Sequence, residues 1–185
     1  MRALIAVIVV MAGVLLPAGP ASAGLWQFTD GFEGDNPNLR WSFTDQGECG
    51  VPLYGNIGGQ PRTGTRSAVV YSGPSAGWCA IGRTIRLSPV AAHPGSRCGM
   101  GVWARVSNNP ATQLNVEVID PATWTYLALA TVTSDGTSGY RQVTVTWNAW
   151  QADVVLRFAT VHVGGAGPGV MARTELDDVL VQCFY

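Results

Sequence analysis

Apolar and polar residues alternate over much of the chain beyond residue 23. Nine segments combine this alternation, or a short apolar run, with β-branched and aromatic residues, a pattern typical of strands. They are 41–44, 67–72, 79–87, 98–106, 114–120, 126–133, 141–147, 153–161 and 174–183. Turn-forming stretches such as SGPSAG, HPGS, SNNP and SDGTSG separate them. Repeat spacings near ten residues (about 8–12 is usual) predict an all-β domain, an antiparallel sandwich or jelly roll.

Helices are not predicted anywhere in this region. The apolar spacing of 153–161 is compatible with a helix, but its VVLRFATV run is rich in β-branched residues and favours a strand. The alternation also assigns side chains to faces. If the strands share one sheet, its outer face carries Trp103, Arg105, Asn115, Glu117, Thr144 and Arg157.

Such an outer face has the chemistry that a sugar needs. The C–H faces of a sugar ring lie on an aromatic plate, and its hydroxyls need fixed donors and acceptors, which Arg, Asn and carboxylate groups supply. Aromatic residues in turn-rich stretches could flank the same groove, namely Tyr54, Trp78, Trp124 and Tyr126. The alternative is an ordinary solvated sheet face, as antiparallel sheets commonly have. We expect Trp26 and Trp41 in the core, whereas Trp147 and Trp150 fit either place.

The first 23 residues form a separate unit of the sequence. They contain one Arg, a long apolar run and the small residues Ala-Ser-Ala. This pattern predicts a secretory signal peptide, cleaved after Ala23. The apolar run is short of the ~20 residues that span a bilayer, which disfavours an uncleaved anchor. Residues 24–185 then form a single domain, secreted and not held in a membrane after cleavage.

Composition narrows the classes of partner. The chain has 11 basic and 12 acidic residues, and every basic residue is Arg. No basic cluster follows a phosphate backbone, so we expect no nucleic-acid partner, and we expect a monomer. Four cysteines in an exported chain predict two disulfides, although the sequence does not choose among the three pairings. We favour Cys49–Cys79 and Cys98–Cys183; a zinc site is disfavoured because no C-x-x-C pair occurs.

Two adjacent acids near the end of the chain need an explanation. In LDDVLV, alternation places Asp177 on the same face as Val179 and Val181, so we expect its carboxylate to point inward. A buried carboxylate is costly unless it is paired or coordinated. A calcium ion could satisfy it, with further oxygen atoms from Asp30, Glu33 and Asp35. The alternative is a salt bridge from Asp177 or Asp178 to Arg66 or Arg173.

Several short motifs follow one another in a recognisable order. They are DGFEG, WSF, RTGTRSAVV, GRTIRL, GVWARV, WTYLAL, YRQVTVTW and LDDVLV. The series resembles the galactose-binding-domain-like jelly rolls, in particular the carbohydrate-binding modules of secreted bacterial cellulases and xylanases, over nearly all of 26–183. The resemblance implies a structural calcium ion held by Glu33, the loop at Gly64 and Thr65, and Asp177, with Asp178 pointing outward. It also implies sugar binding on one sheet face.

Motifs for catalysis are absent from the sequence. It contains no G-x-S-x-G, H-E-x-x-H or phosphate-binding P-loop motif. Glu117 and Asp120 lie on one segment but on opposite faces, which does not suit the paired carboxylates of a glycosidase. We therefore expect a non-catalytic carbohydrate-binding protein, with a cell-surface structural or interaction domain as the alternative and a glycan hydrolase as a weaker one.

Overall fold

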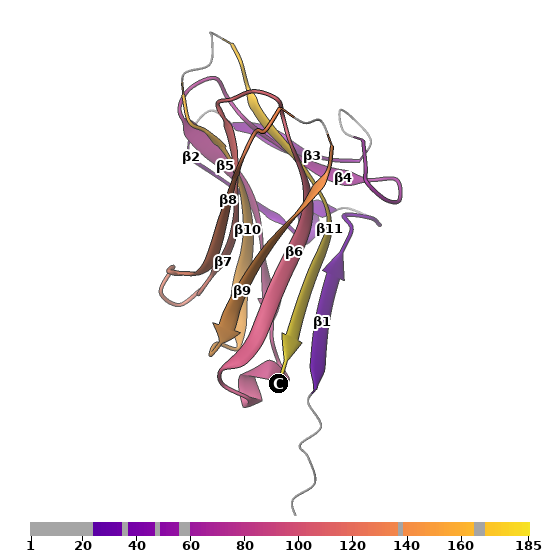
Figure 1. The fold of residues 1–185 in the computed structure, drawn as a ribbon, viewed down its shortest axis with the longest axis vertical. Coiled ribbons are helices and arrows are strands. Elements are labelled where there is room, and N and C mark those ends of the chain that lie inside the picture. The colour runs from indigo at the N-terminus through magenta and orange to yellow at the C-terminus, as the bar shows by residue number, and fades with distance from the viewer. Residues whose placement is uncertain (1–23, 35–36, 47–48, 56–59, 137–138, 165–168) are drawn as a thin grey trace, which may run out of the picture.

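The computed structural model describes residues 24–34, 37–46, 49–55, 60–136, 139–164 and 169–185. The predicted signal peptide therefore lies outside the described residues. The described part of the chain consists mainly of strands (Figure 1). They are β1 (Leu25–Asp30), β2 (Ser42–Gln46), β3 (Cys49–Gly55), β4 (Ser67–Ser72), β5 (Gly77–Arg86), β6 (Ser96–Val106), β7 (Thr112–Ile119), β8 (Tyr126–Thr133), β9 (Arg141–Ala149), β10 (Asp153–His162) and β11 (Ala172–Phe184). Short 3₁₀ turns occur at Pro37–Leu39 and Val90–Ala92, and no described helix is long and apolar enough to cross a membrane.

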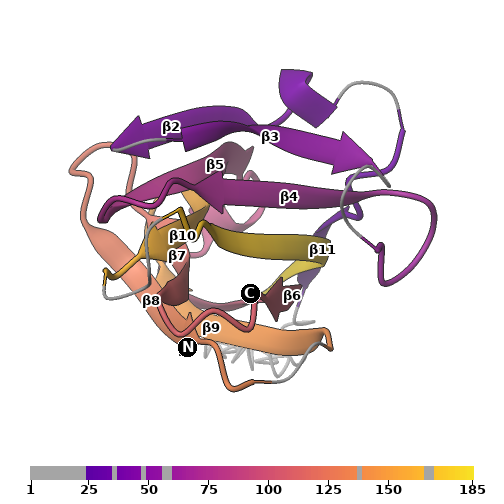
Figure 2. The same ribbon diagram turned by 90° about the horizontal axis from the view of Figure 1, so that it is seen from above.

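The strands form two antiparallel sheets that face each other as a sandwich. Sheet A has the order β3-β4-β11-β6-β9, with β1 also paired to β11, and sheet B has the order β2-β5-β10-β7-β8. The chain passes between edge strands of the two sheets from β2 to β3 (Figure 2) and again from β8 to β9. The predicted all-β sandwich is confirmed.

All nine predicted strands are present. The segment 153–161 is strand β10, not a helix. β1 and β3 were not among the predicted strands. The sequence of β3, CGVPLYG, contains Pro and Gly, which weaken the strand signal. Its place at an edge of sheet A is where a proline in a strand is tolerated.

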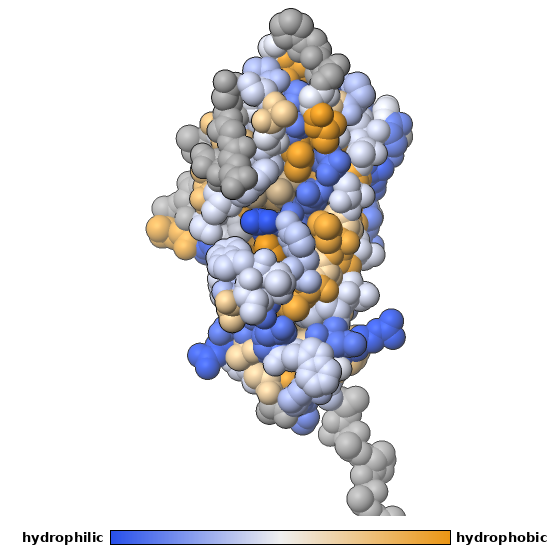
Figure 3. All heavy atoms as spheres, turned by 90° about the vertical axis from the view of Figure 1, so that its left-hand side faces the viewer, coloured by the Kyte–Doolittle hydropathy of each residue, from blue (hydrophilic) through white to orange (hydrophobic). Residues whose placement is uncertain are grey.

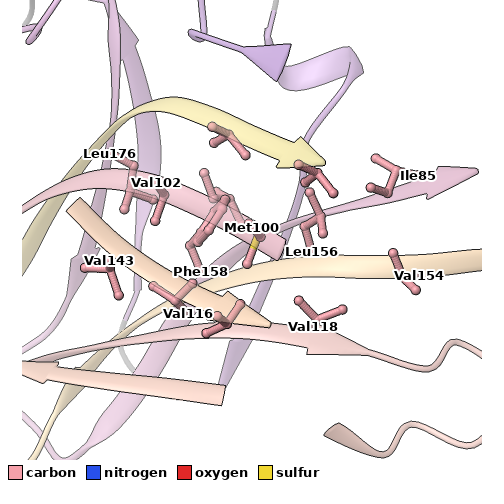
Figure 4. Close-up of a cluster of buried hydrophobic side chains, with 14 of the residues drawn as sticks. Ile85, Met100, Val102, Val116, Val118, Val143, Val154, Leu156, Phe158 and Leu176 are labelled. Carbon is pink, nitrogen blue, oxygen red and sulfur yellow. The ribbon is translucent and has the colours of Figure 1, made fainter. Parts of the chain in front are cut away.

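The core lies between the sheets and is built from the alternate residues that the pattern predicts. Phe158, Leu156 and Val116 of sheet B pack with Met100, Val102 and Leu176 of sheet A (Figure 4). Trp41 is buried in this cluster, and Trp26 packs against it. Trp147 is also buried, whereas Trp150 is exposed.

Both disulfides have the predicted pairing. Cys49–Cys79 joins β3 of sheet A to β5 of sheet B, and so ties the two sheets together. Cys98 and Cys183 are direct partners across β6 and β11, with Cα atoms 4.1 Å apart. The last strand is thereby fixed to the centre of sheet A.

The predicted single outer face is wrong. β6 and β9, which carry Trp103, Arg105 and Thr144, belong to sheet A, whereas β7 and β10 belong to sheet B. Asn115, Glu117 and Arg157 therefore lie on the opposite side of the molecule. Alternation along a strand separates inward from outward side chains, but it does not say which strands share a sheet.

A β-bulge also changes the predicted direction of Asp177. Its pairing partner is Trp103, on the outer face, while Leu176 before it pairs with Ala104 in the core. The register shifts between Asp177 and Leu180, and Asp178 has a left-handed φ of 48°. The extra residue restores Val179 to the core. Asp177 is completely buried, but on the outer side of sheet A.

Candidate functional site

A hollow of about 280 Å³ lies on the outer face of sheet B. Five of its lining residues are candidates from the sequence, and two are small or apolar: Trp78, Asn115, Glu117, Tyr126, Arg157, Ala159 and Val161. Strand register explains the grouping, because Arg157 pairs with Glu117, Ala159 with Asn115, and Val161 with Trp78. Polar and apolar side chains are mixed over this side of the molecule (Figure 3).

The polar part of the hollow is built on a buried ion pair. Arg157 Nε donates to Glu117 Oε2, and the two side chains are only 18% and 2% exposed. Burial raises the pKa of the Glu117 carboxyl above its ordinary value, and the hydrogen bond and charge of Arg157 oppose this rise. Arg157 Nη2 also donates to Tyr126 Oη at 3.3 Å. The guanidinium is therefore fixed by neighbours from β7 and β8.

Further contacts position the other members of the hollow. The Arg157 guanidinium lies over the Trp78 ring, 5.1 Å from its centroid. Asn115 Oδ1 accepts hydrogen bonds from Gln113 Nε2 and Thr131 Oγ1, at 2.9 and 3.1 Å. These bonds fix the orientation of the Asn115 amide in the hollow.

Two exposed aromatic side chains lie at the start of β8 and in the turn before it. Tyr126 is 54% exposed and Trp124, two residues earlier, is 65% exposed. The turn before them is ordered by Asp120, whose Oδ1 accepts the Ala122 N–H at 2.9 Å and whose carbonyl accepts the Trp124 N–H at 2.8 Å. This turn holds Trp124 at a left-handed φ of 56°. Trp124 does not line the hollow, and the side chain of Tyr54 lies outside the described residues.

The remaining two candidates belong to a different environment on sheet A. The Arg62 guanidinium lies over the Trp103 ring, 3.9 Å from its centroid, and thus covers that face of the indole. Arg105 Nη2 donates to both carboxylate oxygens of Glu175, each at 2.5 Å. Trp103 and Arg105 therefore do not contribute to the hollow on sheet B.

The three predicted calcium ligands come together at the loop 62–66. Glu33 Oε1 accepts the N–H groups of Thr65 and Arg66, and Glu33 Oε2 accepts the Thr65 hydroxyl at 2.9 Å. Partial burial acts to raise the pKa of Glu33, but these hydrogen bonds outweigh it and lower the pKa. Gly64 has a φ of 61°, which allows the loop to turn around this carboxylate.

Asp177 binds the first part of the same loop. Its Oδ2 accepts the N–H groups of Arg62 and Thr63, at 2.8 and 3.1 Å, and its Oδ1 accepts the Asp178 N–H. Burial raises the pKa of Asp177, although the N–H groups of Thr63 and Arg62 oppose the rise. Asp178 pairs with Arg62, a salt bridge that differs from the predicted alternatives with Arg66 or Arg173.

The oxygen atoms at this loop meet the needs of a hard cation such as calcium only in part. Glu33 Oε2 and Asp177 Oδ1 each accept one hydrogen bond, which leaves lone pairs for a metal. Among the described residues, however, no group of three or more His, Cys, Asp or Glu side chains is arranged to hold a metal ion. An ion here would need backbone or hydroxyl oxygens, such as that of Thr65, in addition.

A different acid points into the sandwich. Asp30 at the end of β1 is 7% exposed and pairs with Val179 on the core side. It accepts the Trp41 indole N–H at 3.1 Å and forms a salt bridge with Arg83 at 2.6 Å. The sequence indicated Asp30 only as a metal ligand. Its partner Arg83 belongs to the other sheet, and the distance between the two residues along the chain does not reveal this pairing.

Solved structures share this fold. No family model matches the chain, and no curated protein matches its sequence. The module TmCBM61, solved with β-1,4-galactotriose, has a TM-score of 0.54 at 9% identity, over 76% of this chain and 86% of that one. A xylan-binding domain of family CBM 22 has a TM-score of 0.52 at 15% identity, over 84% and 93%. A bacteriophage CBA120 tailspike has 0.54 at 13% identity, over 78% of this chain but 19% of its own.

Proposed function

We propose that this protein, which has the β-sandwich fold of carbohydrate-binding modules, is a secreted, non-catalytic protein that binds a polysaccharide or cell-wall glycan at the hollow on sheet B. One observation carries the proposal. Two aromatic side chains, Trp78 and Tyr126, line the same hollow as the fixed polar groups of Asn115, Glu117 and Arg157. Aromatic surface and oriented donors and acceptors are the two requirements of a sugar site.

In this proposal the aromatic and polar groups have separate tasks. The exposed ring of Tyr126 offers a surface for the C–H face of a sugar ring, with Trp124 next to it along a longer glycan. Arg157 and Asn115 supply N–H donors, and Glu117 supplies an acceptor, to the hydroxyls. These polar groups are already held by one another, so little ordering is needed when a ligand binds.

The arrangement of the acids supports binding without hydrolysis. Glu117 is engaged by Arg157, and the Asp120 carboxylate accepts hydrogen bonds within its own turn. The backbone N–H of Ala122 is the main reason for the lowered pKa of Asp120. A glycosidase needs two carboxyl groups on either side of the scissile bond, one of them able to donate a proton. These two acids have other partners.

Export is the second part of the proposal. Two disulfides are stable in an oxidising compartment, and the signal-like segment at residues 1–23 gives a route to it. Detection of the protein in culture medium with Gly24 as its first residue would support both statements. Retention of the full-length chain inside the cell would contradict them.

Calcium at the loop 62–66 is a separate proposal, with a structural role. Glu33 and Asp177 would hold the ion together with oxygen from Thr65, joining the first and last strands. An ion bound only by the folded state must stabilise it, so chelator should lower the melting temperature and added calcium should restore it. An unchanged melting temperature in chelator would contradict this proposal and leave the glycan proposal intact.

Retention on insoluble polysaccharides tests the main proposal. The oxidised protein is incubated with cellulose, xylan, chitin, β-glucan, galactan and the producer's own cell wall. We expect retention on one of these polymers and release by its soluble oligosaccharide, with no new reducing ends after long incubation. Absence of retention on every polymer would contradict glycan binding and favour a protein-interaction domain; new reducing ends would contradict the non-catalytic assignment.

A further inference from the structure

β6 ends beside the point where β11 begins (Figure 1). A second cluster of charged side chains lies there, on the outer face of sheet A. It borders a pocket of about 210 Å³, lined by Arg105, Val106, Ser107, Asn108, Arg173 and Glu175. Two guanidinium groups and one carboxylate give this lining a net charge of +1. The hollow on sheet B is on the other side of the molecule, so the two sites are independent.

Glu175 is fully used within the protein. Its side chain is only 4% exposed. Its Oε1 accepts from Nη2 of both Arg105 and Arg173, at 2.5 and 2.6 Å. Its Oε2 accepts from Arg105, from the Gln60 N–H at 3.1 Å and from Tyr140 Oη at 3.5 Å. One buried carboxylate therefore positions two arginines, and its negative charge is shared between them.

The arginines keep donors for a ligand. Each guanidinium has five N–H groups. Among contacts between the described residues, Arg173 donates through Nη2 alone and Arg105 donates to Glu175 and, at 3.4 Å, to Gln60. Their side chains are 31% and 21% exposed, and both border the pocket.

Aromatic rings hold both arginines in place from the protein side. Arg105 lies over the Tyr140 ring at 5.6 Å, and Arg173 lies over the Tyr71 ring at 5.7 Å. Each guanidinium is thus held by a ring and by Glu175. Arginines restricted in this way lose little freedom on binding, and their planar fork matches a carboxylate or another oxyanion.

We propose that the Arg105–Arg173 pocket binds an oxyanion group, such as the carboxylate of an acidic sugar or a sulfate or phosphate group. Asn108, exposed at the rim, adds an amide donor. Glu175 carries one negative charge and faces two positively charged arginines. An anionic ligand would balance the remaining positive charge. The proposal does not require the glycan function and stands if the sheet B hollow binds nothing.

An NMR titration of the oxidised full chain tests the proposal. Acetate, sulfate, phosphate and glucuronate are added at constant ionic strength in chloride, with glucose as the uncharged match to glucuronate. We expect saturable shifts at 105–108 and 173–175 with at least one oxyanion and none with glucose. Shifts with acetate and glucuronate assign a carboxylate site, and shifts with sulfate or phosphate alone assign a tetrahedral oxyanion. No saturable shift with any of them would overturn the proposal.

Variants separate binding at this pocket from general attraction of anions. Arg173→Gln should weaken binding about tenfold, the usual effect of losing a charge-assisted contact, and Arg173→Lys should weaken it less. Asn108→Asp adds a negative charge at the rim and should also weaken binding. Asn148→Asp adds the same charge at an exposed position near the other end of the sheet, opposite Arg97, and should have no such effect. Equal effects of the two Asn→Asp variants would contradict the site.

Discussion

Replacement of Arg157 by Gln should destabilise the fold strongly at neutral pH. Arg157 is the charged partner of Glu117, whose side chain is 2% exposed. Removing one member of a buried ion pair costs about 3–5 kcal/mol, because the other charge stays buried without compensation. We expect the lower end, about 3 kcal/mol, since the pair borders an open hollow and the carboxyl can take up a proton. For a domain of this size, that loss lowers the melting temperature by about 6–12 °C.

The loss should depend on pH in a definite direction. The pKa of Glu117 is already raised by burial, and Arg157 opposes that rise. Above the ordinary glutamate pKa of about 4.3, the folded state therefore binds more protons than the unfolded state. The stability from this proton is complete below the ordinary pKa and is lost as the pH rises through the folded pKa. The variant should thus approach the wild type in stability as the pH falls toward 4.

Urea unfolding of five proteins at several pH values measures these quantities. They are the wild type, Arg157→Gln, Glu117→Gln and the double variant, with Arg86→Gln as an exposed arginine control on the same sheet. The neutral double variant should be more stable than Arg157→Gln alone. A cost for Arg157→Gln no larger than that for Arg86→Gln, or a cost that grows as the pH falls, would refute the reasoning.

Three further predictions concern the loop and the disulfides. Gly64→Ala should destabilise the folded state by about 1–3 kcal/mol, because φ is 61° and a Cβ would lie 2.2 Å from Glu33 Oε1. Gly136→Ala is the control in thermal unfolding: its φ is 77° but the space around it is open, so it should cost less. Asp177→Asn should lower the free energy of unfolding despite the raised pKa, because an amide group cannot accept the N–H bonds that reach both carboxylate oxygens; no change in urea unfolding would contradict this. Loss of Cys98–Cys183, which closes 85 residues, should cost about 4–5 kcal/mol, and loss of Cys49–Cys79, which closes 30, about 3–4; the reverse order would be inconsistent with loop-closure entropy.

The sequence was sufficient for much of the fold. Strand periodicity located β2 and β4 to β11. The residues that alternate with the predicted outer positions Trp103, Glu117 and Arg157 lie in the core, namely Val102, Val116 and Phe158. These predictions succeed because the alternation of one strand depends only on its own residues. The pattern did not reveal β3, because an edge strand does not need a continuous apolar pattern.

Relations between strands could not be predicted in the same way. Trp103 and Glu117 have equivalent positions in their own strands, yet they lie on opposite sheets because the order of strands is set by long-range pairing. Asp177 was assigned to the wrong face because a single extra residue at the bulge inverts the alternation. Glu175, whose contacts organise the second pocket, gave no signal beyond a polar residue in an apolar strand.

The sequence grouped some residues of the candidate site correctly, and there is a physical reason for this. Asn115, Glu117 and Arg157 lie on neighbouring strands, so alternation alone brings them to one face once β7 and β10 pair. Trp78 enters the same hollow through its register with Val161. The small residue Ala159, which pairs with Asn115, was not recognised as part of the site, although its parity is that of Arg157.

A comparison of two aromatic variants tests the central claim most directly. On the polymer that retains the wild-type protein, the dissociation constants of Tyr126→Ala and Trp103→Ala are measured by adsorption isotherms, with unfolding curves to confirm that both variants fold. The account predicts that Tyr126→Ala weakens binding by about tenfold or more, as expected for the loss of an aromatic contact in a binding site, and that Trp103→Ala binds as the wild type does. Loss of binding in Trp103→Ala, with Tyr126→Ala unaffected, would place the glycan site on sheet A and contradict the account.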